Sequence, residues 1–250
     1  MLKGRVAIVT GAGTGIGAAI ARLLAENCCH VVLAGRRSAP LQTLALEIGG
    51  VAVPTNVASE ADVASLFDTC VQSHGRLDIL VNNAGIAGPT VEIERENISD
   101  WDEVFAVNVR GVMLCIKHAV PLMKDRGGAI VNVASDAVLR PKARRTAYAA
   151  SKRAVLAITE ATAQELGQHG IRVNSLVPGA TDTEMLKEVF SARARYAGVS
   201  EAEIMEKAIR GTALKRISTP ADIAAGALYL VGDASRTVTG TMLVIDAGMR

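Results

Sequence analysis

A cluster of glycines directly after the first apolar run limits what this chain can fold into. The run 6–10 is typical of a buried parallel strand, and Gly11, Gly15 and Gly17 separate it from a helical stretch and a second apolar run at 31–34. In such a unit the first glycine permits a tight turn, the second lets backbone N–H groups approach a pyrophosphate, and the third lets the helix pack on the strand. The sequence therefore predicts a dinucleotide site at the start of the first helix, with a plain turn as the alternative.

The same alternation of strand and helix continues to the end of the chain. Further apolar runs, predicted to be strands, lie at 51–54, 77–81, 129–134, 173–177 and 243–245. Amphipathic stretches, predicted to be helices, lie at 18–26, 41–48, 60–73, 101–124, 148–168 and 221–231. We therefore expect the α/β class, as a single doubly wound parallel sheet of the Rossmann type with helices on both faces, over residues 1–250. The polar helical segment 184–212 is predicted to be a substrate lid.

Composition and charge argue against several classes of protein. A net charge of +2 and an aromatic content of 3% do not suit nucleic-acid binding, and no uninterrupted apolar run reaches the ~18 residues of a membrane helix. The residues before the first predicted strand have no signal-peptide pattern, so we expect a chain without one. The four cysteines, at positions 28, 29, 70 and 115, have neither metal-ligand nor disulfide spacing, and the four histidines are scattered. We therefore expect a cytoplasmic protein without a metal site.

The end of the first helix lacks the glycine that often terminates a helix. Asn27 is followed by two adjacent cysteines, Cys28 and Cys29. Because asparagine tolerates the left-handed conformation, Asn27 is the predicted left-handed residue.

Tyr148 and Lys152 lie four residues apart in a stretch rich in helix-forming residues. This spacing places both side chains on one face of a helix. An ammonium beside a phenol favours the phenolate, which makes a tyrosine usable as a general acid and base near neutral pH. Taken alone, this spacing more often marks an ordinary surface pair on a helix.

Four elements in this order resemble the short-chain dehydrogenase/reductase family over essentially the whole chain. They are the glycine cluster, the run Asn82-Asn83-Ala84-Gly85, Ser135, and the pair Tyr148 and Lys152. The resemblance implies that Ser135 holds a carbonyl oxygen and that Tyr148 gives it a proton or takes one from it. It also implies that Lys152 lowers the pKa of Tyr148 and holds the cofactor ribose. Asn108, the fourth member of the implied catalytic set, would position a water that links Lys152 to solvent.

The resemblance also implies a set of cofactor contacts. They are Gly11, Thr14, Gly15, Ile16, Gly17, Arg36, Arg37, Asn56, Val57, Asn83, Ala84, Gly85, Tyr148, Lys152, Pro178, Gly179, Thr181 and Thr183. Asn56 departs from the family pattern, which often has an aspartate there at the adenine.

The choice of cofactor depends on the end of the second predicted strand. An NAD-specific site usually has an acidic residue there, whereas this chain has Arg36 and Arg37 and no acidic residue from 30 to 45. Because an arginine fork matches phosphate geometry, we predict NADP(H) as the preferred cofactor, carried mainly by Arg36, with NAD(H) possible. Thr14 argues for a modest preference, since many NADP-using relatives have a basic residue at that position.

The predicted function is hydride transfer between the nicotinamide cofactor and a secondary alcohol or ketone. A catalytically silent NAD(P)-sensing protein on the same fold is the alternative. The substrate stays open among 3-oxoacyl thioesters, sugars or polyols, and cyclic ketones. The cationic loop 140–145 either is a solvated loop or attracts an anionic substrate.

The helix around Tyr148 also suggests an assembly. Ala150, Ala154, Ala157 and Ala161 would let a partner helix approach closely, and the family usually forms tetramers. We therefore expect a homotetramer, with a dimer as the fallback.

Overall fold

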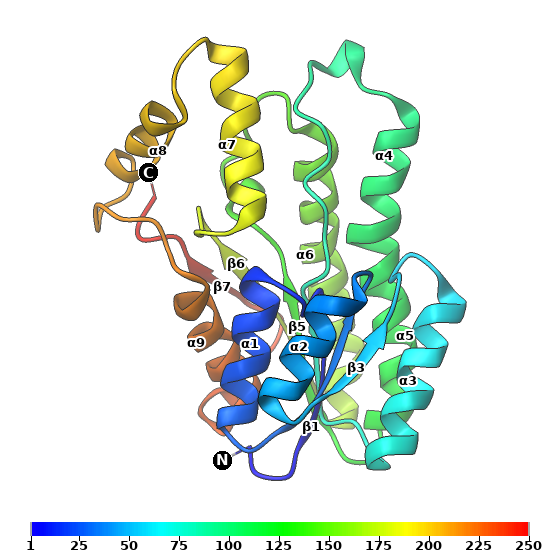
Figure 1. The fold of residues 1–250 in the computed structure, drawn as a ribbon. Coiled ribbons are helices and arrows are strands. Elements are labelled where there is room, and N and C mark those ends of the chain that lie inside the picture. Colours follow the sequence, from blue (N-terminus) through cyan, green and yellow to red (C-terminus); the bar gives the residue numbers. More distant parts are fainter. Residues whose placement is uncertain (1, 250) are drawn as a thin grey trace.

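The computed structural model describes residues 2–249 and contains one sheet of seven parallel strands, with helices on both faces (Figure 1). The strand order is β3-β2-β1-β4-β5-β6-β7. Strands are added outward on one side of β1 as far as β3 and then on the other side from β4 to β7, which confirms the doubly wound prediction. The strands are β1 Val6–Thr10, β2 His30–Gly35, β3 Val51–Pro54, β4 Ile79–Asn82, β5 Gly128–Val133, β6 Ile171–Pro178 and β7 Met242–Ile245.

Two apolar cores lie on the two faces of the sheet. One packs β-strand residues such as Ile8 against α3, α5 and α6, and the other packs residues such as Val9 against α1, α2 and α9. The alternation of side chains along β1 explains why neighbouring residues enter different cores. The helices are α1 Gly15–Glu26, α2 Ser38–Ile48, α3 Glu60–His74, α4 Ile98–Phe105, α5 Gly111–Met123, α6 Thr146–Leu166, α7 Glu184–Ala197, α8 Glu201–Arg210 and α9 Pro220–Val231.

The helix predicted at 101–124 contains a π-helical segment. This segment, Ala106–Arg110, connects α4 directly to α5, so that the three form one continuous helix. An 18-residue window of the continuous helix Ile98–Met123 has a mean hydropathy of 1.3, so this helix is long and apolar enough to cross a membrane by length and composition alone. The expectation that no uninterrupted apolar run reaches that length still holds, since Asn108, Arg110 and Lys117 lie within this helix. Its inner side packs on the sheet and on α3, which accounts for much of the apolar composition.

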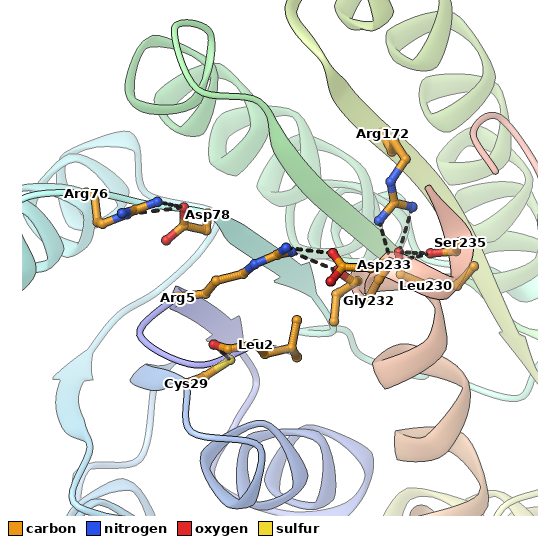
Figure 2. Close-up of polar contacts among 11 residues, drawn as sticks. Leu2, Arg5, Cys29, Arg76, Asp78, Arg172, Leu230, Gly232, Asp233 and Ser235 are labelled. Atoms are coloured by element: carbon orange, nitrogen blue, oxygen red, sulfur yellow. Dashed lines mark hydrogen bonds and ion pairs between the residues drawn. The ribbon is translucent and has the colours of Figure 1, made fainter. Parts of the chain in front are cut away.

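Arginine side chains connect the two ends of the chain at the amino edge of the sheet (Figure 2). Arg5 Nη2 lies 2.7 Å from Asp233 Oδ1, just beyond α9, and Arg172 Nη1 donates to the carbonyl of Leu230 at 2.8 Å. Arg76 pairs with the nearly buried Asp78 at the same edge. These contacts lie opposite the carboxyl edge, where an α/β sheet places its ligand site.

The end of α1 differs from the prediction. Asn27 has φ −89° and ψ 22°, and its side-chain amide donates to the carbonyl of Leu23 at 2.8 Å. Cys28 takes the left-handed conformation instead, with φ +64°. Asn27 uses its side chain to satisfy an end carbonyl of the helix, so the chain reverses one residue later.

Candidate active site

A cavity of about 410 Å³ opens at the carboxyl edge of the sheet. Its floor comes from residues that follow β4, β5 and β6, and its cover comes from α7 and α8. Ser135, Tyr148 and Lys152 line it, as do the predicted cofactor contacts Ile16, Asn83, Gly85, Pro178, Gly179, Thr181 and Thr183. The sequence therefore located this edge from residues that are far apart along the chain.

The glycine turn has the geometry that a dinucleotide requires. Gly11 and Gly15 have φ of +63° and +56°, and a Cβ on Gly17 would lie 2.3 Å from the Gly11 carbonyl oxygen. Thr14 begins α1 but makes no capping hydrogen bond, whereas Ser or Thr side chains cap α3, α7, α8 and α9. No capping side chain therefore occupies the N–H groups of the first turn of α1, which suits a pyrophosphate.

Asn83 and Ala84 stabilise the glycine turn from β4. The Asn83 side-chain amide donates to the carbonyls of Thr10 and Gly11 at 2.9 and 3.1 Å. The backbone N–H groups of Asn83 and Ala84 both donate to Thr10 Oγ1 at 3.0 Å. Gly85 is the closest of this run to the catalytic set, because a Cβ there would lie 3.3 Å from Lys152 Nζ.

A chain of buried hydrogen bonds fixes α6, the helix that carries Tyr148, against the sheet. Asn82 Nδ2 donates to Asn132 Oδ1 at 2.9 Å, and Asn132 Nδ2 donates to Thr159 Oγ1 at 2.9 Å. Ser175 Oγ donates to the same Thr159 oxygen at 2.8 Å, so β4, β5 and β6 all contribute. The helix therefore has one preferred register on the sheet, because a shifted Thr159 would leave buried polar groups without partners.

Tyr148 is half-buried, with its hydroxyl end inside the cavity. Burial raises the pKa of its hydroxyl, while a hydrogen bond from Ser135 and the charge of Arg145 lower it. The Arg145 guanidinium lies 4.5 Å from the ring centroid, against 5.9 Å for Lys152 Nζ. The sequence assigned the lowering of the Tyr148 pKa to Lys152. Arg145 is the cation nearer to the ring centroid, and the effect of Lys152 on the pKa of Tyr148 stays a prediction.

Lys152 is almost completely buried, at 5% exposure. Its Nζ donates to the carbonyl of Val133 at 2.9 Å, and burial lowers its pKa to about 8. An ammonium has three donors, so two remain for a ribose hydroxyl and for water.

The side chain of Asn108 is engaged by the protein. Its Oδ1 accepts from the N–H of Ile86 at 2.8 Å, and its Nδ2 donates to the Ile86 carbonyl and to Ser151 Oγ, both at 3.0 Å. Both donors of the amide are used. A water positioned by Asn108 would therefore have to donate to an acceptor, either the backbone carbonyl of Asn108 or the second lone pair of its Oδ1. Asn108 lies in the π-helical segment, where the backbone hydrogen-bond pattern departs from that of an α-helix.

The residues expected around the adenine and its ribose lie beside the glycine turn. Arg37 Nη2 donates to Thr14 Oγ1 at 3.2 Å, and Arg36 is exposed next to it. Asn56 uses its Oδ1 to accept from the N–H of Ala58 at 3.1 Å. Val57 is buried against α5, where a Cβ on Gly111 would meet it at 2.8 Å, so we expect any cofactor contact of Val57 to come from its backbone.

The loop after β6 leads directly into the cover of the cavity. Thr183 caps α7, since its Oγ1 accepts from the N–H of Leu186 at 3.3 Å, and its methyl group lies 3.3 Å from the position of a Cβ on Gly15. Gly179 is required by close packing, because a Cβ there would lie 2.6 Å from that of Asp246. The start of α7 therefore contacts the glycine turn.

Several cavity residues carried no sequence signal that we used. Arg193, Phe190 and Met249 line the cavity, as does Asp136 after β5. Arg145 was recognised only as part of a cationic loop. It is the N-cap residue of α6, three residues before Tyr148, and its guanidinium lies 4.5 Å from the Tyr148 ring centroid. Within residues 2–249 we find no cluster of His, Cys, Asp or Glu that could hold a metal ion.

Comparison with known proteins agrees with this geometry. The family described as "Enoyl-(Acyl carrier protein) reductase" matches residues 11–250. The chain is 36% identical to cis-4-hydroxycyclohexanecarboxylate dehydrogenase of Sinomonas cyclohexanicum, over 98% of this chain and 96% of that protein. The chain belongs to the short-chain dehydrogenase/reductase family.

Solved structures of short-chain dehydrogenases and reductases show the same fold. NAD⁺-bound xylitol dehydrogenase superimposes with a TM-score of 0.94 at 30% identity, covering 99% of each chain. A variant of actinorhodin polyketide ketoreductase with NADPH gives 0.93 at 30% identity, covering 97% of this chain and 96% of that one. The chain is therefore an NAD(P)-dependent oxidoreductase that transfers hydride between an alcohol and a ketone. The comparisons give no support to the cofactor-sensing alternative.

Proposed function

We propose that this short-chain dehydrogenase/reductase acts on a secondary alcohol or ketone with Tyr148 as its general acid and base and NADP(H) as its preferred cofactor. The observation that carries the proposal is the convergence of Tyr148, Ser135 and Lys152 on one cavity that extends to the uncapped start of α1. A nicotinamide cofactor bound there supplies or accepts the hydride.

The residues of the chain divide the remaining work. Ser135 orients the carbonyl oxygen of the substrate toward the Tyr148 hydroxyl. Because burial raises the pKa of Tyr148, the phenol holds its proton at neutral pH and can give it to the forming alkoxide. Lys152 can use its two remaining donors to bind the cofactor ribose and a water, and Asn108 holds the loop at Ile86 beside it.

The position of Arg37 supports NADP(H) over NAD(H). The absence of a basic residue at position 14 argued for a modest preference, but Arg37 now brings a guanidinium to Thr14 from α2's N-cap. Arg36 has no hydrogen-bond or ion-pair partner in the part of the chain that the structure describes, so it is available to a 2′-phosphate. No carboxylate between 30 and 45 would repel that group.

We expect NADPH to bind about tenfold more tightly than NADH, or better, because a charge-assisted hydrogen bond contributes about 1.5–3 kcal/mol. Fluorescence titration of both reduced cofactors measures this, and Arg36→Ala should remove most of the preference. Arg37→Ala should remove a smaller part of the preference, since the Arg37 guanidinium already donates to Thr14 Oγ1. Tighter binding of NADH, or an Arg36→Ala protein that still prefers NADPH as strongly, would contradict the assignment.

Substrate assays can assign the class of substrate. The relatives named above act on a hydroxycyclohexanecarboxylate, a polyol and a polyketide, according to their names. Steady-state assays of the purified enzyme with NADPH and NADH against 3-oxoacyl thioesters, sugars and cyclic ketones test the proposed function directly. Turnover of none of them with either cofactor would refute it.

We propose that α7 and α8 act as a lid over the cavity. They share a small apolar cluster of Phe190, Ala194 and Ile204, which is separate from the two cores on the sheet. Such a separate cluster allows the pair to move without disturbing the sheet. Slower amide exchange in α7 and α8 after addition of NADPH would support closure, and unchanged exchange would count against it.

We propose a homotetramer in which α4, α5 and α6 pair between subunits. Met113 on α5 is 44% exposed, and on α6 Ala157 and Ala161 are exposed while Ala150 and Ala154 are half-buried, so a partner helix could approach closely. Light scattering at micromolar concentration should report about four times the chain mass of 26.1 kDa. A mass of twice the chain mass would exclude the tetramer and support the dimer. A mass equal to that of one chain would exclude the tetramer and the dimer.

A cytosolic location is also a proposal. Cys29, Cys70 and Cys115 are buried free thiols, and burial raises their pKa to about 11, 11 and 12, so each stays protonated and unreactive. Cell fractionation tests the location.

A further inference from the structure

The cations of the loop 140–145 do not all have the same role. Arg140 Nη1 lies 3.0 Å from Asp246 Oδ2, and Arg144 Nε lies 3.1 Å from Glu92 Oε1. The Arg144 guanidinium also lies 3.2 Å from the ring centroid of Tyr196. These two charges are therefore neutralised by partners outside the cavity.

Arg145 is the exception. It lines the cavity and is 9% exposed, yet its Nη1 is buried without a hydrogen-bond partner among the described residues. A buried donor without a partner is costly, and a guanidinium more so, since it carries five donors and a charge. The Tyr148 ring covers one face of the guanidinium, but a ring contact satisfies none of its N–H groups.

The charges around Arg145 increase this cost. Arg193 from α7 lines the same cavity, and its positive charge adds to burial in lowering the pKa of Arg145. The one carboxylate among the described lining residues is Asp136, which accepts a hydrogen bond from Ser135 Oγ at 3.2 Å. Against it stand five cations: Lys142, Arg145, Lys152, Arg193 and Lys207. An anion that entered the cavity would remove the repulsion and use the free donors.

The remaining wall of the cavity is apolar. Leu186, Val189, Phe190 and Ile204 line it from α7 and α8. This wall suits a hydrophobic body rather than a sugar or polyol. The site therefore combines an apolar wall, a cationic anchor and the Tyr148 hydroxyl.

We propose that Arg145 binds an anionic group of the substrate, namely a carboxylate on an apolar body, and so places the ketone at Tyr148. The inference rests on the proposed function and narrows its substrate class. A planar guanidinium binds a carboxylate with two parallel hydrogen bonds, which fixes orientation as well as charge. Arg193 supports the same anion from the lid, so binding and closure are coupled.

The test compares 4-oxocyclohexanecarboxylate with its ethyl ester, which has the same ring ketone without the charge. In the wild type the acid should have the higher kcat/KM. In Arg145→Leu the acid-to-ester ratio of kcat/KM should fall about 100-fold, mainly through KM for the acid, since a truncated partner of a charged hydrogen-bonded pair typically costs that much. The conservative Arg145→Lys should recover part of the ratio.

The neighbouring substitution Arg144→Leu is the matched control. It removes the same charge from the same loop but outside the cavity, so the acid-to-ester ratio should stay within about twofold of the wild type. If acid and ester fall by the same factor in Arg145→Leu, Arg145 serves only Tyr148 and the proposal is overturned. A wild type that prefers the ester overturns it as well.

A binding measurement separates this proposal from the proposed function. Calorimetric titration of the NADP⁺-loaded protein with cyclohexanecarboxylate needs no turnover. We expect saturable binding that is at least tenfold weaker in Arg145→Leu and unchanged in Arg144→Leu, with no such difference for cyclohexanecarboxamide. Absent or Arg145-independent binding refutes the anion site, whereas carboxylate binding without turnover of any ketone refutes the proposed reaction and leaves the anion site supported.

Discussion

Replacing Tyr148 by Phe should lower turnover by about 10²–10⁴-fold, the usual contribution of a positioned general acid or base. Phe keeps the ring that covers Arg145 and removes only the hydroxyl beside Ser135. Cofactor affinity should therefore change little. Steady-state kinetics with the best ketone, together with fluorescence titration of NADPH, measure both quantities.

The control for this substitution is Tyr229→Phe. Tyr229 is 41% exposed on α9 and does not line the cavity, so turnover should stay near the wild-type value. If the Tyr148→Phe enzyme kept more than about a tenth of wild-type turnover, Tyr148 would not be the proton donor.

Replacing Lys152 by Met should nearly abolish activity and weaken cofactor binding, yet raise the stability of the cofactor-free protein. The native pKa of about 8 lies below the usual lysine pKa of 10.5, so keeping this ammonium charged inside the protein costs about 3 kcal/mol below pH 8. Methionine fills similar volume without a charge but loses the hydrogen bond to Val133, which offsets about 1 kcal/mol. A net gain of about 1–2 kcal/mol should raise Tm by about 3–6 °C at pH 7.

The dependence on pH makes this prediction specific. Between pH 8 and 10.5 the unfolded chain binds more protons than the folded chain at Lys152, so the wild type gains stability from this group as pH rises. The advantage of Lys152→Met should therefore be full below pH 8 and shrink toward pH 10. Lys117→Met, at an exposed lysine outside the cavity, is the control for removing a lysine charge from the protein. A Lys152→Met protein less stable than the wild type at pH 7 would contradict the burial cost.

The fold could be predicted because its signals are local and repeated. The apolar runs at 6–10 and 51–54 match β1 and β3, and most other predicted ends differ by one or two residues. Three helices begin three residues before the predicted start, because their first turns contain Gly15 and Gly17, Ser38 and Pro40, or Ser99 and Asp100, which carry little apolar signal. The π-helical segment could not be predicted, since its residues have ordinary helix-forming character and only packing reveals the extra residue.

The sequence predicted which residues belong to the candidate site better than it predicted the charges and hydrogen bonds around them. Spacing brought Tyr148 and Lys152 to one face of α6, and strand ends brought Ser135 and Gly179 to the same cavity. The sequence could not show that Lys152 would bond to Val133 while Arg145 lay nearer to the phenol, because burial and side-chain direction are properties of the packed molecule. The prediction of a left-handed Asn27 was wrong for a related reason. Its side chain donates to the carbonyl of Leu23, and the sequence does not show this contact.

The hydrogen bonds that join Asn82, Asn132, Thr159 and Ser175 have a consequence for how this enzyme can change over generations. Thr159 lies eleven residues beyond Tyr148, about 16 Å along the axis of α6, and does not line the cavity. A slip of one residue there would turn the helix by about 100° and carry the tyrosine out of the cavity. Selection for turnover therefore acts on residues deep in the interior as well as on those that line the cavity.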